Sequence, residues 1–209
     1  MGLFFYVVVY GIFVMSVVAH EVAHGWVAYQ CGDPTAMRAG RLTFNPLPHI
    51  DPVMTIVLPL IFVLARAPFV IGGAKPVPVN PFLLRNHRRD WLLVSAAGVT
   101  TNLLIAVALA LLIRGLLFTG IFTVDSQGTM ALAMAMVVNI FLALFNLLPV
   151  PPLDGSRILG LLFPDTVGPV MQRLEPVGFV LLIILLWMTP LLDYLAALAY
   201  FLIGVLLSV

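Results

Sequence analysis

The sequence predicts an all-α protein that crosses a membrane several times. Of its 209 residues, 62% are hydrophobic and 9% are charged, and the mean hydropathy is +1.14. Soluble domains are about 45–50% apolar and about 25% charged, so the chain differs from them on both measures. Apolar runs of roughly the 20 residues that one span needs follow one another along the chain. We expect five or six membrane segments in a single domain, 1–209, inside a lipid bilayer.

Each expected segment is an apolar run that proline, glycine or charged residues interrupt. The first run stops after Tyr29, where Gly32 and Pro34 follow, and "PVPPLDG" stops the fourth run. The stretch 156–176 mixes short apolar pieces with charges, as an interfacial region does. We expect a core of 1–160 and a C-terminal helical hairpin, 176–208. The segments are 2–29, 53–71, 91–118, 129–148, 177–188 and 191–207.

The basic residues predict the topology. By the positive-inside rule, connections rich in Lys and Arg face the cytoplasm. The segment 53–71 must then enter and leave on the same side, as a re-entrant or surface-lying element; if it spans instead, the basic residues divide between both faces. We expect a multi-pass protein of the cytoplasmic (inner) membrane whose active site lies nearer the cytoplasmic face. The residues concerned are Arg38, Arg41, Lys75, Arg85, Arg88, Arg89, Arg157 and Arg173.

The stretch "AKPVPVNP", 74–81, favours a short extended ribbon, because its alternating prolines do not suit a helix. An extended edge can pair with an unwound segment of another chain by β-addition. Lys75, Val77 and Val79 are therefore candidates for clamping a substrate. A rigid surface loop is the alternative, since the prolines lack N–H donors.

Three ionisable residues interrupt the first apolar run, in "HEVAH". His20 and His24 are four residues apart and share one face of a helix, so both imidazoles can reach a single ion. Glu21 is placed to act as general base on a water. Without a partner, such groups inside a bilayer each cost about 2.5–3.5 kcal/mol, which favours a metal site over histidines that only form interfacial hydrogen bonds.

A catalytic zinc site needs a third protein ligand and an open position for water. Asp154 follows a helix that runs in the same direction as the first one, and both end near the same face. This depth argument favours Asp154 as the third ligand. His49 and Asp51 are rivals, but "PLPHIDP" is a connection that we expect at the membrane surface.

The combination of "HEVAH" with a later "NLLPVPPLDG", 146–155, resembles the site-2 proteases, which are intramembrane zinc metalloproteases. The likeness covers about residues 14–160 and is strongest to small bacterial and archaeal members without a PDZ or nucleotide-sensing domain. It implies one zinc ion bound by His20, His24 and Asp154, with Glu21 as general base. One departure is Val99, which stands where the family usually has a proline; this change is expected to straighten 91–118 and removes no ligand.

Asparagine side chains in apolar helices need hydrogen-bond partners. Asn146 and Asn102 are candidates for holding the substrate backbone or the oxyanion of the transition state, and the alternative for each is a helix–helix hydrogen bond. Asn139, on the same face as Asn146, is expected to be structural.

The expected function is zinc-dependent hydrolysis of peptide bonds in or near the transmembrane segment of single-span proteins. A metal carrier would need a path of acidic and histidine residues, which the segments from 91 onward barely supply, and an inactive scaffold would be expected to lack Glu21 or a ligand. A net charge of +1 without Lys/Arg runs does not favour nucleic acid as a partner.

Overall fold

The computed structural model describes residues 3–66 and 72–208, and the side chains from residue 8 onward. Within these residues the chain is helical and forms no strand. Five helical stretches are long and apolar enough to cross a membrane: Val8–Gln30, His87–Phe118, Gln127–Asn146, Gly168–Met188 and Leu191–Ser208. The chain is therefore an all-α polytopic membrane protein, as its composition predicts.

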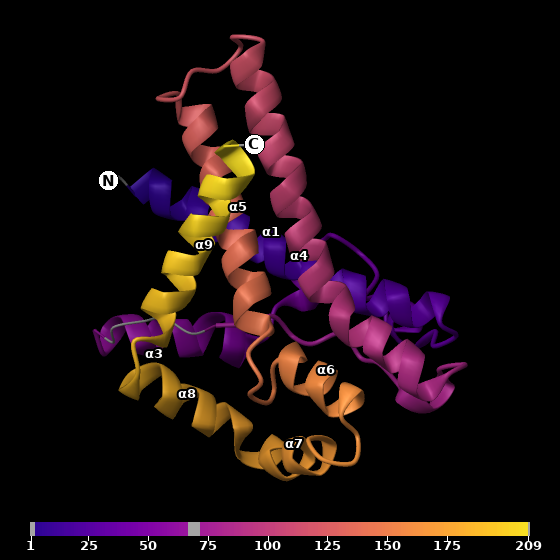
Figure 1. Ribbon diagram of the computed structural model, residues 1–209. Coiled ribbons are helices and arrows are strands. Elements are labelled where there is room, and N and C mark those ends of the chain that lie inside the picture. Colours follow the sequence, from indigo (N-terminus) through magenta and orange to yellow (C-terminus); the bar gives the residue numbers. More distant parts are fainter. Residues whose placement is uncertain (1–2, 67–71, 209) are drawn as a thin grey trace.

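The N-terminal helix α1 (Leu3–Gln30) crosses behind two long helices, α4 (His87–Phe118) and α5 (Gln127–Asn146) (Figure 1). It ends where Gly32 adopts a left-handed φ of +109°, which a residue without a Cβ tolerates. The Asp33 N–H then bonds to the Ala28 carbonyl and closes the last turn. A short helix, α2 (Thr35–Arg38), follows.

Side-chain caps fix where α4 and α5 begin. Asn86 accepts a hydrogen bond from the Arg89 N–H, and Asp90 accepts one from the Asn86 N–H, so both satisfy free donors at the start of α4. Ser126 caps α5 through the Thr129 N–H. Over its 32 residues α4 is about 48 Å long, which exceeds the roughly 30 Å hydrocarbon core. It runs unbroken through Val99, in agreement with the absence of a proline there.

The segment predicted at 53–71 is a short element that returns to its starting point. It contains η2 (Pro52–Val57) and α3 (Leu58–Leu64), and residues 67–71 lie outside the described part. The 13 residues from Pro52 to Leu64 extend about 20 Å, less than a bilayer core. The Gly73 N–H bonds to the Met54 carbonyl, and the Thr55 hydroxyl bonds to the Gly73 carbonyl. Both ends of the segment therefore lie together, which matches the re-entrant or surface-lying arrangement rather than a full span.

Beyond α5 the chain turns sharply into α6 (Asp154–Leu162), where Gly155 packs directly against the carbonyl of Leu147. Then follow α7 (Gly168–Leu174), η4 (Glu175–Val177), α8 (Gly178–Met188) and α9 (Leu191–Ser208). In Figure 1, α8 lies across the lower ends of α5 and α9, and α9 runs back up beside α5. The helical hairpin predicted for 176–208 stays a prediction. Two successive helices, α8 and α9, do occupy this range, but their axes diverge steeply in this view and do not run side by side.

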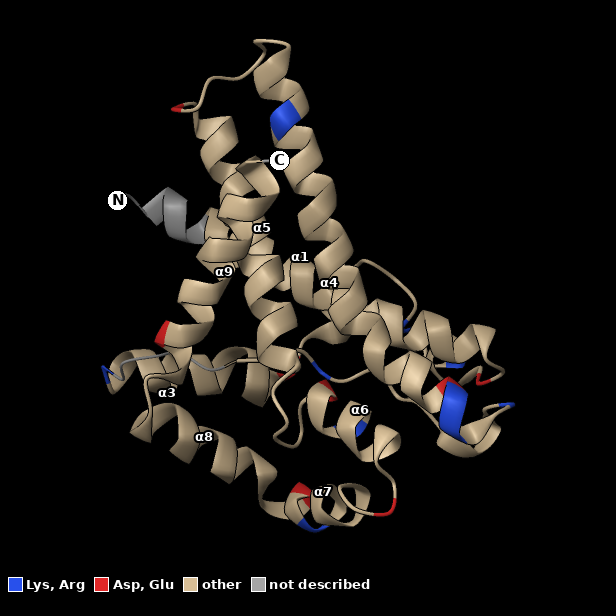
Figure 2. Ribbon diagram, in the orientation of Figure 1, with Lys and Arg blue, Asp and Glu red and all other residues tan. Residues whose placement is uncertain are grey.

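Alanines of two helices pack around larger side chains of α5 in the membrane core. Ala106 and Ala110 of α4, Met136 and Ile140 of α5 and Ala199 of α9 form one buried cluster. Packing of this kind drives helix association in lipid, where the hydrophobic effect between helices is absent. Most charged residues lie instead toward the end that holds α6, α7 and the start of α4 (Figure 2).

Candidate active site

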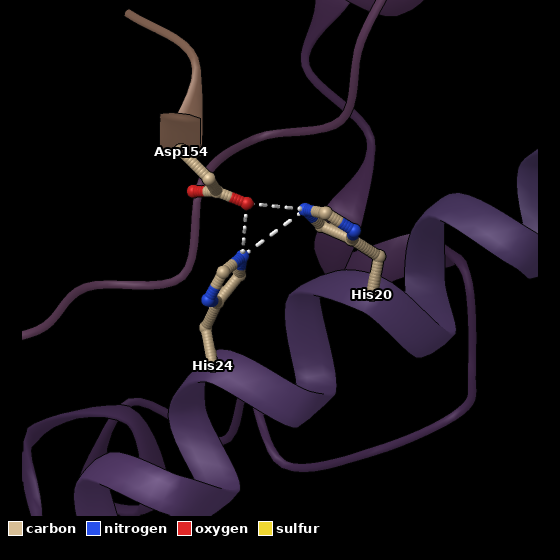
Figure 3. A group of neighbouring side chains, drawn as sticks. All are labelled: His20, His24 and Asp154. Atoms are coloured by element: carbon tan, nitrogen blue, oxygen red, sulfur yellow. Dashed lines mark hydrogen bonds and ion pairs between the residues drawn. The ribbon is translucent and has the colours of Figure 1, made fainter. Parts of the chain in front are cut away.

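Three side chains of types that can bind a metal ion converge where α1, α4 and the start of α6 meet. His20 and His24 lie one turn apart on α1, and Asp154 is the first residue of α6 (Figure 3). The Nε2 atoms of the two histidines are 3.1 Å apart, and Asp154 Oδ2 lies 3.1 Å from one and 3.2 Å from the other. In the described part of the chain this is the group of ligand atoms close enough to hold a metal ion.

The outer nitrogens of both imidazoles are already hydrogen-bonded. His24 Nδ1 donates to the Val94 carbonyl over 2.6 Å, and His20 Nδ1 lies 2.7 Å from Asn102 Oδ1. In a neutral ring this leaves Nε2 as a bare acceptor. Asp154 Oδ2 is buried without a hydrogen-bond partner. Three acceptor atoms that face one another repel unless protons on the imidazoles or a metal cation lie between them.

The donor set fits zinc. Tetrahedral ligands at 2.0–2.1 Å from one ion stand about 3.3 Å apart, close to the separations of these three atoms. Gly98 of α4 leaves the space beside them open, since a Cβ there would lie 2.5 Å from Nε2 of both histidines. Two imidazoles and one carboxylate also leave a fourth position for water or substrate, as catalytic zinc sites require.

The electrostatics of the site keep Asp154 ionised. Burial raises the pKa of its carboxyl group, but the imidazoles of His20 and His24 in contact with it lower the pKa by more when they carry protons on Nε2, so the pKa falls below its usual range. An ionised carboxylate is the form that binds a metal cation.

Glu21 points toward the proline-rich ribbon. Its Oε2 accepts a hydrogen bond from the Val77 N–H over 2.8 Å. The side chain of Val77 is buried, and Gly25 of α1 makes room for it, because a Cβ at Gly25 would lie 2.8 Å from Val77 Cγ1. The ribbon thus passes directly beside α1, next to His20, Glu21 and His24.

Two further anchors hold the ribbon. At its start, the Lys75 N–H bonds to the His49 carbonyl, and Arg41 donates to the Lys75 carbonyl. At its end, the Asn80 N–H bonds to Asp33 Oδ2 over 2.6 Å. The side chain of Lys75 itself is exposed. The roles of Asp33 and Arg41 as anchors of the ribbon were not predicted from the sequence. The available signals were an aspartate directly before Pro34 and an arginine within a short connection.

The rival ligands are used elsewhere. His49 Nε2 bonds to the Thr43 carbonyl over 3.0 Å, and Asp51 caps η2 through the N–H groups of Val53 and Met54. Neither belongs to the group of three ligand atoms, so the structure brings together the set that the depth argument favours.

The two candidate asparagines differ in their contacts. Asn102 is fully buried and bonds to His20, to Asn139 and to the Ser16 carbonyl, which is the helix–helix alternative that the sequence left open. Asn146, at the end of α5, is partly exposed and donates one N–H to the Leu142 carbonyl. Its second amide N–H is available to another acceptor.

Comparison with known proteins gives the same family as the motifs. The profile described as Peptidase family M50 matches residues 121–189, which include Asp154. A Bacillus subtilis protein named as a zinc metalloprotease, YwhC, is 39% identical over 186 residues, 87% of this chain and 80% of that protein. The chain belongs to peptidase family M50, the site-2 protease family. Rip2 of Mycobacterium tuberculosis, also named as a zinc metalloprotease, is 35% identical over 156 residues, 71% of this chain and 57% of its own length.

Rip2 of Mycolicibacterium smegmatis is 32% identical over 185 residues, 86% of this chain and 66% of that protein. No solved structure matches the chain. As a member of family M50 the protein is a membrane-embedded metalloendopeptidase, and its cofactor is zinc.

Proposed function

We propose that this protein hydrolyses peptide bonds within or next to the transmembrane segment of single-span membrane proteins. In this proposal His20, His24 and Asp154 hold one zinc ion and Glu21 is the general base. The observation that carries it is the convergence of three acceptor atoms at 3.1–3.2 Å, two from α1 and one from α6, with Glu21 next in sequence to the first of them. When bound, zinc polarises the substrate carbonyl and lowers the pKa of a water.

The residues of the chain then divide the work. Glu21 takes the proton of the attacking water on a carboxylate oxygen and passes it to the leaving amine. The second amide N–H of Asn146, at the C-terminal end of α5, is a candidate donor to the oxyanion or the substrate backbone. The hydrogen bonds of Nδ1 in His20 and His24 keep both Nε2 atoms turned toward the centre.

We further propose that the ribbon binds the unwound substrate segment. In an extended chain, alternate residues present their backbone groups to the same edge. The Val77 N–H points to Glu21, so Val79 presents its N–H to that same edge, while Pro76 and Pro78 occupy the other. Within the described residues the Val79 N–H has no partner, and it is therefore free to pair with a substrate strand. The prolines, which lack N–H groups, then remove no hydrogen-bond donor from the edge that would pair with the substrate.

The proposed setting is the cytoplasmic membrane, with the site nearer the cytoplasmic face. Its support is the charge distribution: the basic connections flank α6 and the beginning of α4, close to Asp154, whereas the connection between α4 and α5 carries Asp125.

The test uses the full chain, purified and reconstituted in lipid, with a single-span substrate. We expect Glu21→Gln to lower the cleavage rate by about 100-fold or more, because general bases contribute this much, while the zinc content stays at one ion. Glu175→Gln, at an exposed acidic residue of η4, is the matched control and should cleave normally. Asp154→Ala should lose both zinc and cleavage.

The outcomes separate the candidate functions. Wild-type cleavage by Glu21→Gln would remove the proposed base. A wild-type protein that binds zinc but cleaves no membrane substrate would instead favour a carrier or a scaffold. For the ribbon, Val79→Pro should raise KM several-fold with little change in kcat, and an unchanged KM would contradict the clamp.

A further inference from the structure

A chain of buried polar side chains runs from His20 into the membrane core, away from the site. Ser16 and His20 lie on α1, Asn102 on α4 and Asn139 on α5. Their exposed fractions are 6%, 6%, 0% and 2%. Polar groups at this depth need partners, and these four side chains supply most of them for one another.

The direction of the hydrogen bonds follows from the backbone carbonyls at the far end. Asn139 Nδ2 lies 2.9 Å from the Ala135 carbonyl, which can only accept, so this atom must be the amide nitrogen. It also donates to Ser16 Oγ over 2.9 Å, while the Ser16 hydroxyl donates to the Ile12 carbonyl. Asn139 Oδ1 is thereby left as an acceptor.

The same logic fixes Asn102. Its Nδ2 donates to Asn139 Oδ1 over 2.8 Å and approaches the Ser16 carbonyl at 3.4 Å. Asn102 Oδ1 must then face His20, and at 2.7 Å it accepts the hydrogen of Nδ1. A proton on Nδ1 makes Nε2 the free acceptor of the neutral ring. The orientation of one amide on α5 thus sets which nitrogen of His20 is available.

We propose that Asn102 is a positioning residue for the metal centre, held in orientation by Asn139 and Ser16, and that it selects the His20 tautomer that binds zinc. This inference rests on the proposed role of His20 as a ligand. The two histidines are then oriented by different kinds of partner. His24 is oriented by the backbone carbonyl of Val94, which no side-chain substitution removes. His20 alone relies on side chains of other helices.

The experiment measures zinc affinity of the purified full-length protein by competition with a chelator. Asn102→Leu removes the acceptor for His20 and should weaken zinc binding by about 10–100-fold, the usual effect of losing an outer-shell partner. Asn102→Asp keeps an acceptor oxygen and should recover much of the affinity. Ser95→Ala is the control: Ser95 is buried on the same helix, but its hydroxyl bonds to the Trp91 carbonyl. With cobalt in place of zinc, the visible absorption should change in Asn102→Leu and not in Ser95→Ala.

The possible failures are distinct. Wild-type affinity in folded Asn102→Leu overturns the positioning role. If that variant does not fold, Asn139→Leu is measured. It removes the 2.8 Å hydrogen bond that orients Asn102 and leaves only the 3.4 Å contact with the Ser16 carbonyl, so it should still weaken zinc binding several-fold, and an unchanged affinity overturns the proposal equally. Wild-type affinity in His20→Ala would overturn the metal site itself, whereas loss in His20→Ala with none in Asn102→Leu would overturn only this inference.

Discussion

The two halves of α4 are held in different ways. The half from His87 to Asn102 packs against α1 and α6 and buries polar residues, among them Asp90, Ser95 and Asn102, together with Gly98 at the ligand atoms. The half that follows packs against α5 and α9 through Ala106 and Ala110, and its other faces expose leucines. The buried side chains of the first half are specified by hydrogen bonds and close approach, and the buried alanines of the second half by the shape of their packing. The comparison teaches that chemistry and stability can be altered separately along a single helix.

The largest effect should come from Gly98→Ala. Its Cβ would collide with Nε2 of both His20 and His24, whose rings are fixed by hydrogen bonds at Nδ1. We expect zinc affinity to fall by about 100-fold or more, since the loss of outer-shell partners alone costs 10–100-fold. Chelator competition measures this. Gly115→Ala, in the other half of α4, has open space around it and should bind zinc normally; equal losses in the two variants would contradict the comparison.

The next effect concerns stability without chemistry. Met136→Ala empties a site between Ala106, Ala110 and Ala199 in which the methionine is fully buried. We expect a loss of about 2–5 kcal/mol, the cost of such cavities, with unchanged zinc stoichiometry. Unfolding in mixed detergent micelles gives the free energy, and metal analysis gives the stoichiometry. Met130→Ala, at a residue of α5 that is 57% exposed, is the control. Loss of zinc from folded Met136→Ala would show that the two halves are coupled.

The smallest effect should come from Ser95→Ala. This residue is buried in the polar half, but its hydroxyl bonds back to the Trp91 carbonyl of the same helix. The substitution removes the hydroxyl donor and its hydrogen bond together, and the Trp91 carbonyl keeps its place in the helix. We therefore expect the free energy of unfolding to fall by less than about 1 kcal/mol. Zinc affinity should not change. A measurable loss of zinc affinity would mean that any buried polar side chain in this half of α4 affects the site, and not only one that hydrogen-bonds to His20 or His24.

Much of the site could be predicted from local spacing and helix direction. The interval between His20 and His24 places both imidazoles on one helix face, and the common direction of the first and fourth apolar segments places Asp154 near them. The prolines at 76 and 78 predicted the ribbon, and the re-entrant or surface-lying arrangement of 53–71 followed from the basic connections around it. The structure places these residues and segments as expected, because each placement depends on residues close together in the sequence or on the direction in which a segment crosses the bilayer.

What could not be predicted depends on pairs of distant residues. Nothing in the sequence near Asn102 states that its partner is His20 rather than a substrate, because the choice depends on how α1, α4 and α5 cross. Likewise, Gly98 reads as an ordinary small residue in a helix contact until the ligand atoms are seen beside it. The attachment of Val77 to Glu21 also joins segments whose relative position no local pattern encodes.

The turn between α5 and α6 has a further consequence. Because Gly155 packs tightly on the Leu147 carbonyl, the proposed third ligand, Asp154, comes from a tight corner late in the chain, while the other two proposed ligands belong to the N-terminal helix. An ion bound by all three therefore acts as a crosslink that closes most of the polypeptide into one loop, and closing so long a loop restricts the unfolded ensemble. Binding of the ion would then stabilise the folded chain in addition to providing a catalytic group. During synthesis, all three ligands can bind the ion only after α6 has formed.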